Sequence, residues 1–353
     1  MAIGIAVLGA GIFAKEQHVP AILACPSFAL KAVYSRSQKS VDGLVASQDL
    51  KVDTYYDSPE TPSQSLDALL KRDDIQAVII GVPILAQPAL IRKAISAGKH
   101  VMSEKPMAQD LSTAQELLDW YKQPEVSKLG LWAVGENFRF WNSVNRGAEL
   151  VREIGGNLLT FRVNYYTLIP DDDKYLKTEW RKTPGYQGGF LLDGGVHCAA
   201  LLRYLVGATG QKITKLSAFT YLIKPQFKPI DTVHVVLQTS NGSSGNFDIS
   251  FATAFKTGFE AEIVTDKGSV LVHVTDIETT TQNAEGEKIN SKEEVSMTVG
   301  VTEEVAVFAK AIEEGHLDPR LLPQEAFQDL EIIENIIKSG EGGAEPRKIG
   351  LLQ

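Results

Sequence analysis

This 353-residue chain has few cysteines, no long apolar run and fewer basic than acidic residues, and each of these features excludes a class of protein. Cysteine occurs only at Cys25 and Cys198, which is too few for a disulfide framework and indicates a reducing compartment. No stretch approaches the roughly 20 apolar residues of a membrane-spanning helix, and the N-terminal residues lack the basic region and cleavage site of a signal peptide. We therefore expect a cytoplasmic protein with no membrane partner.

Positive charge is also scarce. Lys and Arg number 35 against 44 Asp and Glu, which gives a formal net charge of −9 and a pI near 5.3. Nucleic acid is not an expected partner, because phosphate binding needs concentrated basic surface and no Lys/Arg-rich run is present. The six histidines are scattered without the spacing of a zinc site, so no metal is expected.

Short apolar runs alternate with helical patterns over the first third of the chain. This alternation is typical of βαβ units, and it predicts a Rossmann domain with a doubly wound parallel sheet over residues 1–135. The predicted strands are Ile3–Leu8, Leu30–Tyr34, Ala77–Ile80, His100–Ser103 and Leu129–Val134. The helices between them are expected at residues 39–48, 88–97 and 111–121, with an earlier one that buries Val19, Ile22 and Leu23.

The sequence pattern then changes. Runs that are rich in β-branched residues, or in which apolar and polar residues alternate, follow one another and are separated by turn signals. These runs predict a C-terminal α+β domain over residues 136–353, with a large, mostly antiparallel open sheet. Residues 279–292 are expected to form a hairpin or a mobile loop, and terminal helices over 303–314 and 324–338 can return to the first domain. The predicted strands are Leu158–Tyr165, Ile213–Tyr221, Thr232–Thr239, Gly245–Phe251, Phe259–Val264 and Ser269–Val274.

The segment Gly9-Ala10-Gly11-Ile12-Phe13-Ala14 fits the dinucleotide-binding pattern G-x-G-x-x-G/A. The first glycine permits a tight turn, the second lets the backbone approach a pyrophosphate, and the small third residue allows close helix–strand packing. The segment follows a predicted strand and opens a helix, which is the context that the motif requires. Gly9, Gly11, Ile12 and Phe13 are therefore predicted cofactor contacts.

The end of the second strand indicates which nicotinamide cofactor is used. NAD-binding domains carry an acidic residue there for the ribose 2′-hydroxyl. This chain reads Ser35-Arg36-Ser37, with a guanidinium suited to a 2′-phosphate and two hydroxyl donors. We predict NADP(H) rather than NAD(H). The alternative is that Arg36 is simply a solvated strand end.

Two further segments carry residues suited to hydride-transfer chemistry. Glu104-Lys105-Pro106 follows the fifth strand, at the sheet edge where ligands of such folds bind. Asp193 and His197 are spaced i, i+4, so they share one face if the segment is helical. Each has a structural alternative: Lys105 as a surface lysine, Asp193 as the N-cap of a helix that starts near Gly194, and His197 as an ordinary helix histidine.

Together with Trp180-Arg181 and the run Gly188–His197, these motifs resemble the Gfo/Idh/MocA family, which includes glucose–fructose oxidoreductase and inositol dehydrogenase. The resemblance implies an NADP-dependent member in which Lys105 polarises the substrate oxygen, His197 is the general acid/base and Asp193 assists it. It further implies cofactor contacts from Pro83, Glu104, Lys105, Trp180 and Arg181, and substrate contacts from Asn137 and Arg139. By analogy, the C-terminal sheet is expected to build a homodimer or homotetramer.

The expected function is therefore NADP(H)-dependent oxidation or reduction at a hydroxyl or carbonyl group of a sugar, polyol or related small molecule. Reduction of another acceptor, such as an imine, enone or dihydrodiol, is one alternative, and a non-catalytic NADPH-sensing regulator is another. Ala200, and residues 82–87 after the fourth strand, depart from the pattern of the resembled family. For this reason no particular substrate is implied.

Overall fold

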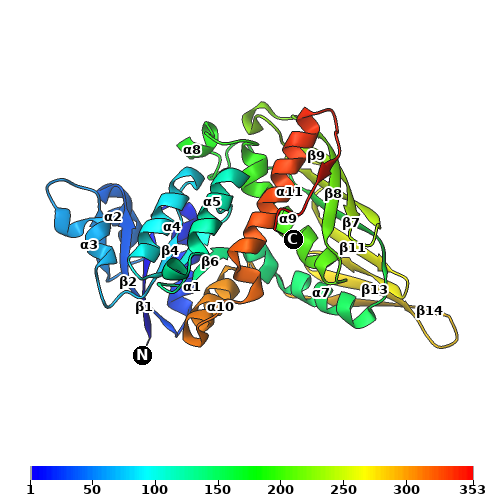
Figure 1. Ribbon diagram of the computed structural model, residues 1–353, viewed down its shortest axis with the longest axis horizontal. Coiled ribbons are helices and arrows are strands. Elements are labelled where there is room, and N and C mark those ends of the chain that lie inside the picture. Colours follow the sequence, from blue (N-terminus) through cyan, green and yellow to red (C-terminus); the bar gives the residue numbers. More distant parts are fainter. Residues whose placement is uncertain (1, 353) are drawn as a thin grey trace. The chain divides into compact units, whose positions relative to one another are not determined.

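The computed structural model describes residues 2–352, which divide into two compact units (Figure 1). Unit 1 contains the chain up to Asn137 together with Val301–Phe327, and unit 2 contains Phe138–Gly300 and the chain from Gln328 onward. Each unit has its own sheet, and the two sheets confirm the predicted fold class.

Unit 1 is built on a six-stranded sheet of order β3-β2-β1-β4-β5-β6, in which every neighbouring pair is parallel. The strand order reverses direction between β1 and β4, which is the point where ligands of doubly wound sheets bind. The strands are β1 (Ile3–Leu8), β2 (Phe28–Ser35), β3 (Asp53–Tyr56), β4 (Ala77–Ile80), β5 (His100–Glu104) and β6 (Trp132–Gly135).

The central strands of unit 1 are buried on both faces, as their nearly continuous apolar runs require. Near the C-terminal end, α10 packs against α1, and the rings of Phe28 and Phe308 lie 6.1 Å apart. The helices are α1 (Val19–Ala24), α2 (Gln38–Ser47), α3 (Leu66–Leu70), α4 (Gln87–Ser96), α5 (Leu111–Tyr121), α6 (Pro124–Ser127) and α10 (Val301–Glu314), and the short turns are η1 (Ala14–His18), η2 (Pro62–Gln64), η3 (Ile84–Ala86) and η6 (Pro319–Leu321).

The first helical segment differs from the prediction in two ways. It contains a π-helical turn, η1, directly after the glycine motif. Its buried face is centred on His18, Val19 and Ile22, whereas Leu23 is 59% exposed. The prediction that Leu23 is buried is therefore wrong, and His18, which the apolar pattern did not indicate, is buried.

Unit 2 is built on a nine-stranded sheet of order β14-β13-β12-β11-β7-β10-β9-β8-β15. Only the central pair β7/β10 is parallel; every other neighbouring pair is antiparallel. Residues 279–292, predicted as a hairpin or mobile loop, belong to the hairpin β13–β14. The strands are β7 (Leu158–Tyr166), β8 (Ile213–Tyr221), β9 (Thr232–Thr239), β10 (Ser244–Ser250), β11 (Gly258–Thr265), β12 (Gly268–Val272), β13 (Asp276–Gln282), β14 (Lys288–Glu294) and β15 (Arg347–Lys348).

One face of this sheet is covered by α9, which packs across β7, β10 and β11. Helix α9 is long and apolar enough to cross a membrane, but 67% of it is buried inside the protein, so burial accounts for its composition. The remaining elements of the chain are α7 (Asn142–Ile154), α8 (Glu179–Lys182), α9 (Phe190–Gly207) and α11 (Pro323–Glu341), with the short turns η4 (Asn137–Phe140) and η5 (Pro225–Phe227).

The opposite face of the nine-stranded sheet carries exposed apolar side chains. Phe219 and Tyr221 on β8 are 67% and 46% exposed, and Val236 on β9 is 57% exposed. The buried residues of β9 alternate with these outward positions, as a sheet with one covered face requires.

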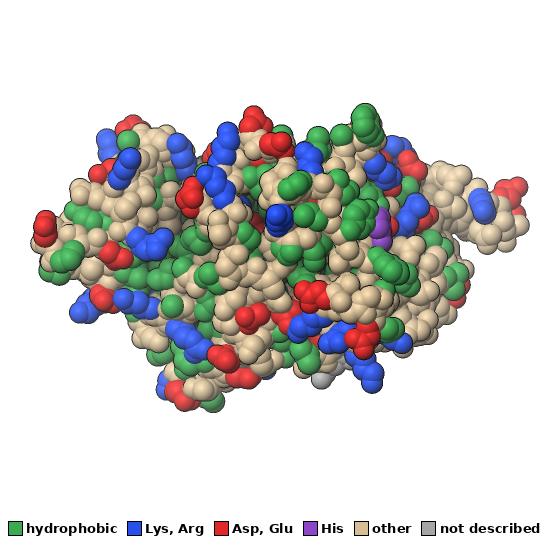
Figure 2. All heavy atoms as spheres, turned by 90° about the horizontal axis from the view of Figure 1, so that it is seen from above, with side chains coloured by type: hydrophobic (Ala, Val, Ile, Leu, Met, Phe, Trp, Pro, Cys, Tyr) green, Lys and Arg blue, Asp and Glu red, His purple; other side chains and the backbone are tan. Residues whose placement is uncertain are grey.

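On the face drawn in Figure 2, Lys and Arg side chains are interspersed with Asp and Glu, and neither sign forms one continuous patch.

Candidate active site

The glycine turn after β1 is closed on one side and open on the other. Gly9 has φ +125° and donates its amide hydrogen to the Tyr34 carbonyl at 2.8 Å. A Cβ added at Gly9 would lie 2.2 Å from the Gly81 carbonyl oxygen, so the backbones that follow β1 and β4 nearly touch. A Cβ added at Gly11 would meet nothing within 4 Å. The open space at Gly11 fits the approach of a pyrophosphate to the start of the helix.

The turn that carries Lys105 is held from three directions within unit 1. His18 Nε2 lies 2.8 Å from Glu104 Oε1, and Trp132 Nε1 donates to Ser103 Oγ at 3.1 Å. Gln87 Nε2 donates to the Pro106 carbonyl at 3.4 Å. Lys105 itself is half-buried. Its backbone is therefore fixed at the carboxyl end of β5, the strand next to β4.

The end of β2 holds both signs of charge. Arg36 is exposed, whereas the Ser37 hydroxyl caps α2 by accepting the Ser40 amide hydrogen at 3.2 Å. The Tyr34 hydroxyl donates to Asp57 Oδ2 at 2.9 Å. Burial, followed by the Asp57 carboxylate, raises the pKa of Tyr34 above its ordinary value, and the Arg36 charge opposes this shift.

The motif Ser35-Arg36-Ser37 did not indicate a carboxylate at this end of β2, but Asp57 lies there. Asp57 follows β3 and is brought to the end of β2 by the parallel pairing of Ser35 with Tyr56. The strand β3 was not predicted, so its acidic neighbour was missed. The run Thr54-Tyr55-Tyr56 is rich in residues that favour strands, and it was the signal that could have revealed both.

The other predicted cofactor contacts in unit 1 lie near the same strand ends. Ile12 and Phe13 begin the helix after the glycine turn, and the Phe13 ring meets the His18 ring edge-on at 5.0 Å. Pro83 precedes the short turn η3 after β4, and Ser35 ends β2. Their roles in binding stay predictions.

Asp193 and His197 lie one turn apart on α9, so the i, i+4 spacing does place them on one face of a helix. The helix begins at Phe190, with Gly189 as its N-cap. The alternative interpretation of Asp193 as an N-cap is therefore wrong: Asp193 lies inside the helix and is 4% exposed. A buried carboxylate needs a partner.

That partner is Arg181, from the segment predicted to lie near the cofactor. Arg181 Nε donates to Asp193 Oδ2 at 2.6 Å, and its guanidinium stacks on the Trp180 ring at 3.9 Å. The Trp180 ring in turn lies 6.2 Å from that of Tyr186. Burial and the Asp193 charge raise the pKa of Tyr186, a neighbour that the sequence motifs did not indicate. Trp180-Arg181 thus builds the surroundings of Asp193.

The imidazole of His197 is stacked on Phe138, with ring centroids 4.2 Å apart and 13° between the ring planes. Phe138 belongs to the segment Asn137–Phe140, which the sequence indicated only for its polar residues. Arg139 is buried and bonded to Asp329, and Arg203 NH1 donates to the same carboxylate at 2.6 Å. The predicted substrate contacts of Asn137 and Arg139 stay predictions, but Arg139 also anchors the turn that carries Phe138.

Lys105 belongs to unit 1, whereas Asp193 and His197 belong to unit 2. The contacts described above therefore hold Lys105 within unit 1, and Asp193 and His197 within unit 2.

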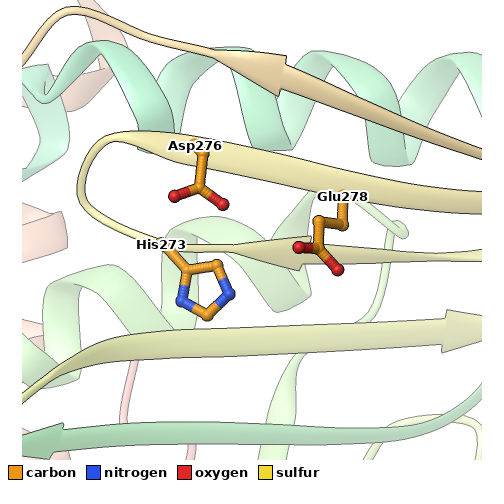
Figure 3. Close-up of side chains that lie close together, drawn as sticks. All are labelled: His273, Asp276 and Glu278. Atoms are coloured by element: carbon orange, nitrogen blue, oxygen red, sulfur yellow. The ribbon is translucent and has the colours of Figure 1, made fainter.

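A separate polar cluster lies on the β12–β13 hairpin (Figure 3). Potential ligand atoms of His273, Asp276 and Glu278 lie within 4.8 Å of one another. Lys292 Nζ lies 2.9 Å from Asp276 Oδ1 and 3.2 Å from Glu278 Oε1, and these carboxylates raise the pKa of Lys292. The Lys292 ammonium, on β14, thus lies within ion-pair distance of both carboxylates.

Comparison with known proteins links both units to one family of oxidoreductases. Residues 3–127 match the Gfo/Idh/MocA family profile described as "NAD-binding Rossmann fold", and residues 149–349 match that of its C-terminal alpha/beta domain. Dehydrogenase FPY6 of Fusarium mangiferae is 45% identical over 337 residues, which is 96% of each chain. A D-xylose 1-dehydrogenase (NADP(+)) of Haloferax volcanii is 25% identical over 96% of this chain and 97% of its own. The crystal structure of a Thermotoga maritima oxidoreductase superposes with a TM-score of 0.84 at 26% identity and covers both chains completely.

The two glycines of the turn are expected to respond differently to substitution. Gly11→Ala should leave the protein folded, because the added Cβ meets no protein atom within 4 Å, but it should weaken dinucleotide binding by about tenfold or more by obstructing the pyrophosphate. Gly9→Ala should lower the thermal unfolding midpoint, because its Cβ meets a carbonyl oxygen and its φ is positive. Fluorescence titration and thermal unfolding of both variants check this. Undiminished binding by Gly11→Ala would show that no phosphate approaches there.

Proposed function

Because the chain belongs to the Gfo/Idh/MocA oxidoreductase family, we propose that it transfers hydride between NADP(H) and a hydroxyl or carbonyl group of a sugar, polyol or related small molecule. The observation that carries the proposal is the arrangement on α9, where Arg181 holds the buried Asp193 carboxylate one turn from His197. Bound NADP⁺ supplies the hydride acceptor in oxidation, and NADPH supplies the hydride donor in reduction.

In this proposal His197 exchanges the substrate proton. In oxidation the imidazole accepts the hydroxyl proton, and in reduction the imidazolium returns it to the developing alkoxide. Asp193 supports the charged imidazolium from the preceding turn, and Arg181 keeps the carboxylate in place through a charge-assisted hydrogen bond. Phe138 restricts the imidazole plane by stacking on it. The Lys105 ammonium, on a turn held by three hydrogen bonds, polarises the substrate oxygen.

The preference for NADP(H) rests on Arg36, which is exposed at the end of β2. Its guanidinium is suited to bidentate contact with a 2′-phosphate. Asp57 opposes this preference electrostatically, although its carboxylate already accepts the Tyr34 hydroxyl hydrogen. The xylose dehydrogenase from Haloferax volcanii, named as an NADP(+) enzyme, shows that a similar chain is associated with this cofactor.

Arg36→Ala is expected to weaken NADPH binding by about 10- to 100-fold, the loss of one or two charge-assisted hydrogen bonds, while NADH binding changes by less than about twofold. Asp57→Asn is the matched variant at the same strand end, and it should strengthen NADPH binding because a negative charge is removed. Fluorescence titration of each variant with both dinucleotides measures this. Equal losses with NADPH and NADH would remove the assignment to NADP(H).

His197→Ala is expected to lower kcat by about 10²- to 10⁴-fold, the usual contribution of a general acid/base, with dinucleotide affinity kept. The assay first screens the wild-type protein against a panel of sugars, polyols and small carbonyl compounds. The substrate that the wild type turns over fastest is then used to measure kcat. His316→Ala, at an exposed histidine, is the control and should leave kcat unchanged. Full turnover by His197→Ala would refute the acid/base role. NADPH binding by the wild type without turnover on any substrate would favour a sensing regulator.

We also propose that the chain forms a homodimer or homotetramer through the outer face of its nine-stranded sheet. The exposed Phe219, Tyr221 and Val236 give this face an apolar surface, which is atypical of a face in contact with water. Phe219→Asp should lower the mass measured by sedimentation to that of a monomer, about 38.5 kDa. Leu23→Asp, at a similarly exposed leucine of α1, should not. A wild-type monomer would contradict the proposal.

A further inference from the structure

His18 is a buried histidine with only one of its two ring nitrogens satisfied. Its side chain has no exposed surface, and Nε2 lies 2.8 Å from Glu104 Oε1. Nδ1 has no hydrogen-bond partner within residues 2–352, the part of the chain that the structure describes. Buried polar atoms are nearly always paired, so a half-satisfied imidazole in a core needs an explanation.

The surroundings of His18 connect three strand ends. His18 closes the π turn that follows the glycine motif, and its ring meets the Phe13 ring at 5.0 Å. A Cβ added at Gly81, just after β4, would lie 3.3 Å from both Nδ1 and Cε1 of His18. The carboxylate that His18 binds ends β5. The imidazole thus fills the space between the glycine turn, the end of β4 and the turn that carries Lys105.

Packing alone does not explain a histidine at this place. The ring meets the Phe13 ring and lies beside Gly81, and an apolar ring of similar size would keep these contacts without leaving a buried nitrogen unpaired. Only the bond to Glu104 requires the imidazole. Glu104 directly precedes Lys105, and its side chain keeps 16% of its surface exposed. The bond therefore joins the helix of the glycine turn to the Lys105 turn.

We propose that His18 is a positioning residue of the dinucleotide site. Its bond to Glu104 sets the Lys105 turn, which would face the nicotinamide end of the cofactor, relative to the glycine turn, which would face the pyrophosphate. This inference rests on the proposed function. A π-helical turn directly after the glycine motif supports it, since such turns occur frequently at functional sites.

The test compares His18→Phe with His18→Gln in the full chain, using whichever of NADPH and NADH the wild type binds. His18→Phe keeps a ring of similar size but loses the bond to Glu104. Its unfolding midpoint should stay the same or rise, and its dinucleotide Kd should change by less than about threefold, since the pyrophosphate contacts are intact. Its kcat should fall by about 10- to 100-fold, as small misplacements of catalytic groups do. The change in nicotinamide emission on binding should be smaller than in the wild type.

His18→Gln places an amide N–H where Nε2 lies and should restore most of the kcat and the emission change. His100→Phe, at the opposite end of β5, is the control; it loses the hydrogen bond from the Leu131 amide and should leave both readouts unchanged. Wild-type kcat and emission in His18→Phe would overturn this inference alone. So would a lowered unfolding midpoint with equal losses in the Phe and Gln variants, which would show a purely structural histidine. Failure of the wild type to bind either dinucleotide would overturn the proposed function and this inference together.

Discussion

The close approach of two backbones at the carboxyl ends of β1 and β4 is the constraint on which the candidate site depends. Gly9 lies so near the Gly81 carbonyl that no side chain fits between them, and Gly81 leaves just enough room for the His18 ring. A side chain at Gly9 would force the two backbones apart, whereas a side chain at Gly81 would press on the His18 ring. The open space at Gly11, the buried Ala14 and the bond from His18 to Glu104 belong to the turn and helix that follow this contact.

Several polar groups of the candidate site share a second feature, which is that a charged or hydrogen-bonding partner holds each of them on a helix, a strand end or a turn. Arg181 holds Asp193 on α9, His18 and Trp132 hold the end of β5, and Arg139 and Arg203 share Asp329. A buried carboxylate or guanidinium without such a partner would be strongly destabilising. The partners therefore keep the fold stable and also restrict the positions of the groups that would contact substrate and cofactor.

The pattern of apolar and polar residues was sufficient to predict a strand where the segment itself contains all the information needed. The bounds of β8 and β9 match the prediction residue for residue, because a strand with one buried face alternates apolar and polar side chains. The same method missed β3, which has only four residues and is not deeply buried, and Asp57 was missed with it. It also predicted Leu23 to be buried and did not indicate His18, because hydrophobicity alone cannot anticipate a buried histidine bonded to a distant carboxylate.

The fold class, the glycine turn and the family could be predicted from the sequence, because each is encoded by residues close together or by motifs in a characteristic order. Which side chains meet could not be predicted in this way, because it depends on the folded chain. Glu104 is bonded to a histidine 86 residues earlier, Arg139 to an aspartate 190 residues later, and His197 is stacked on a phenylalanine from another element. Such pairs depend on how helices pack on sheets, and that packing is set by the burial of the whole core, which no local stretch of sequence contains.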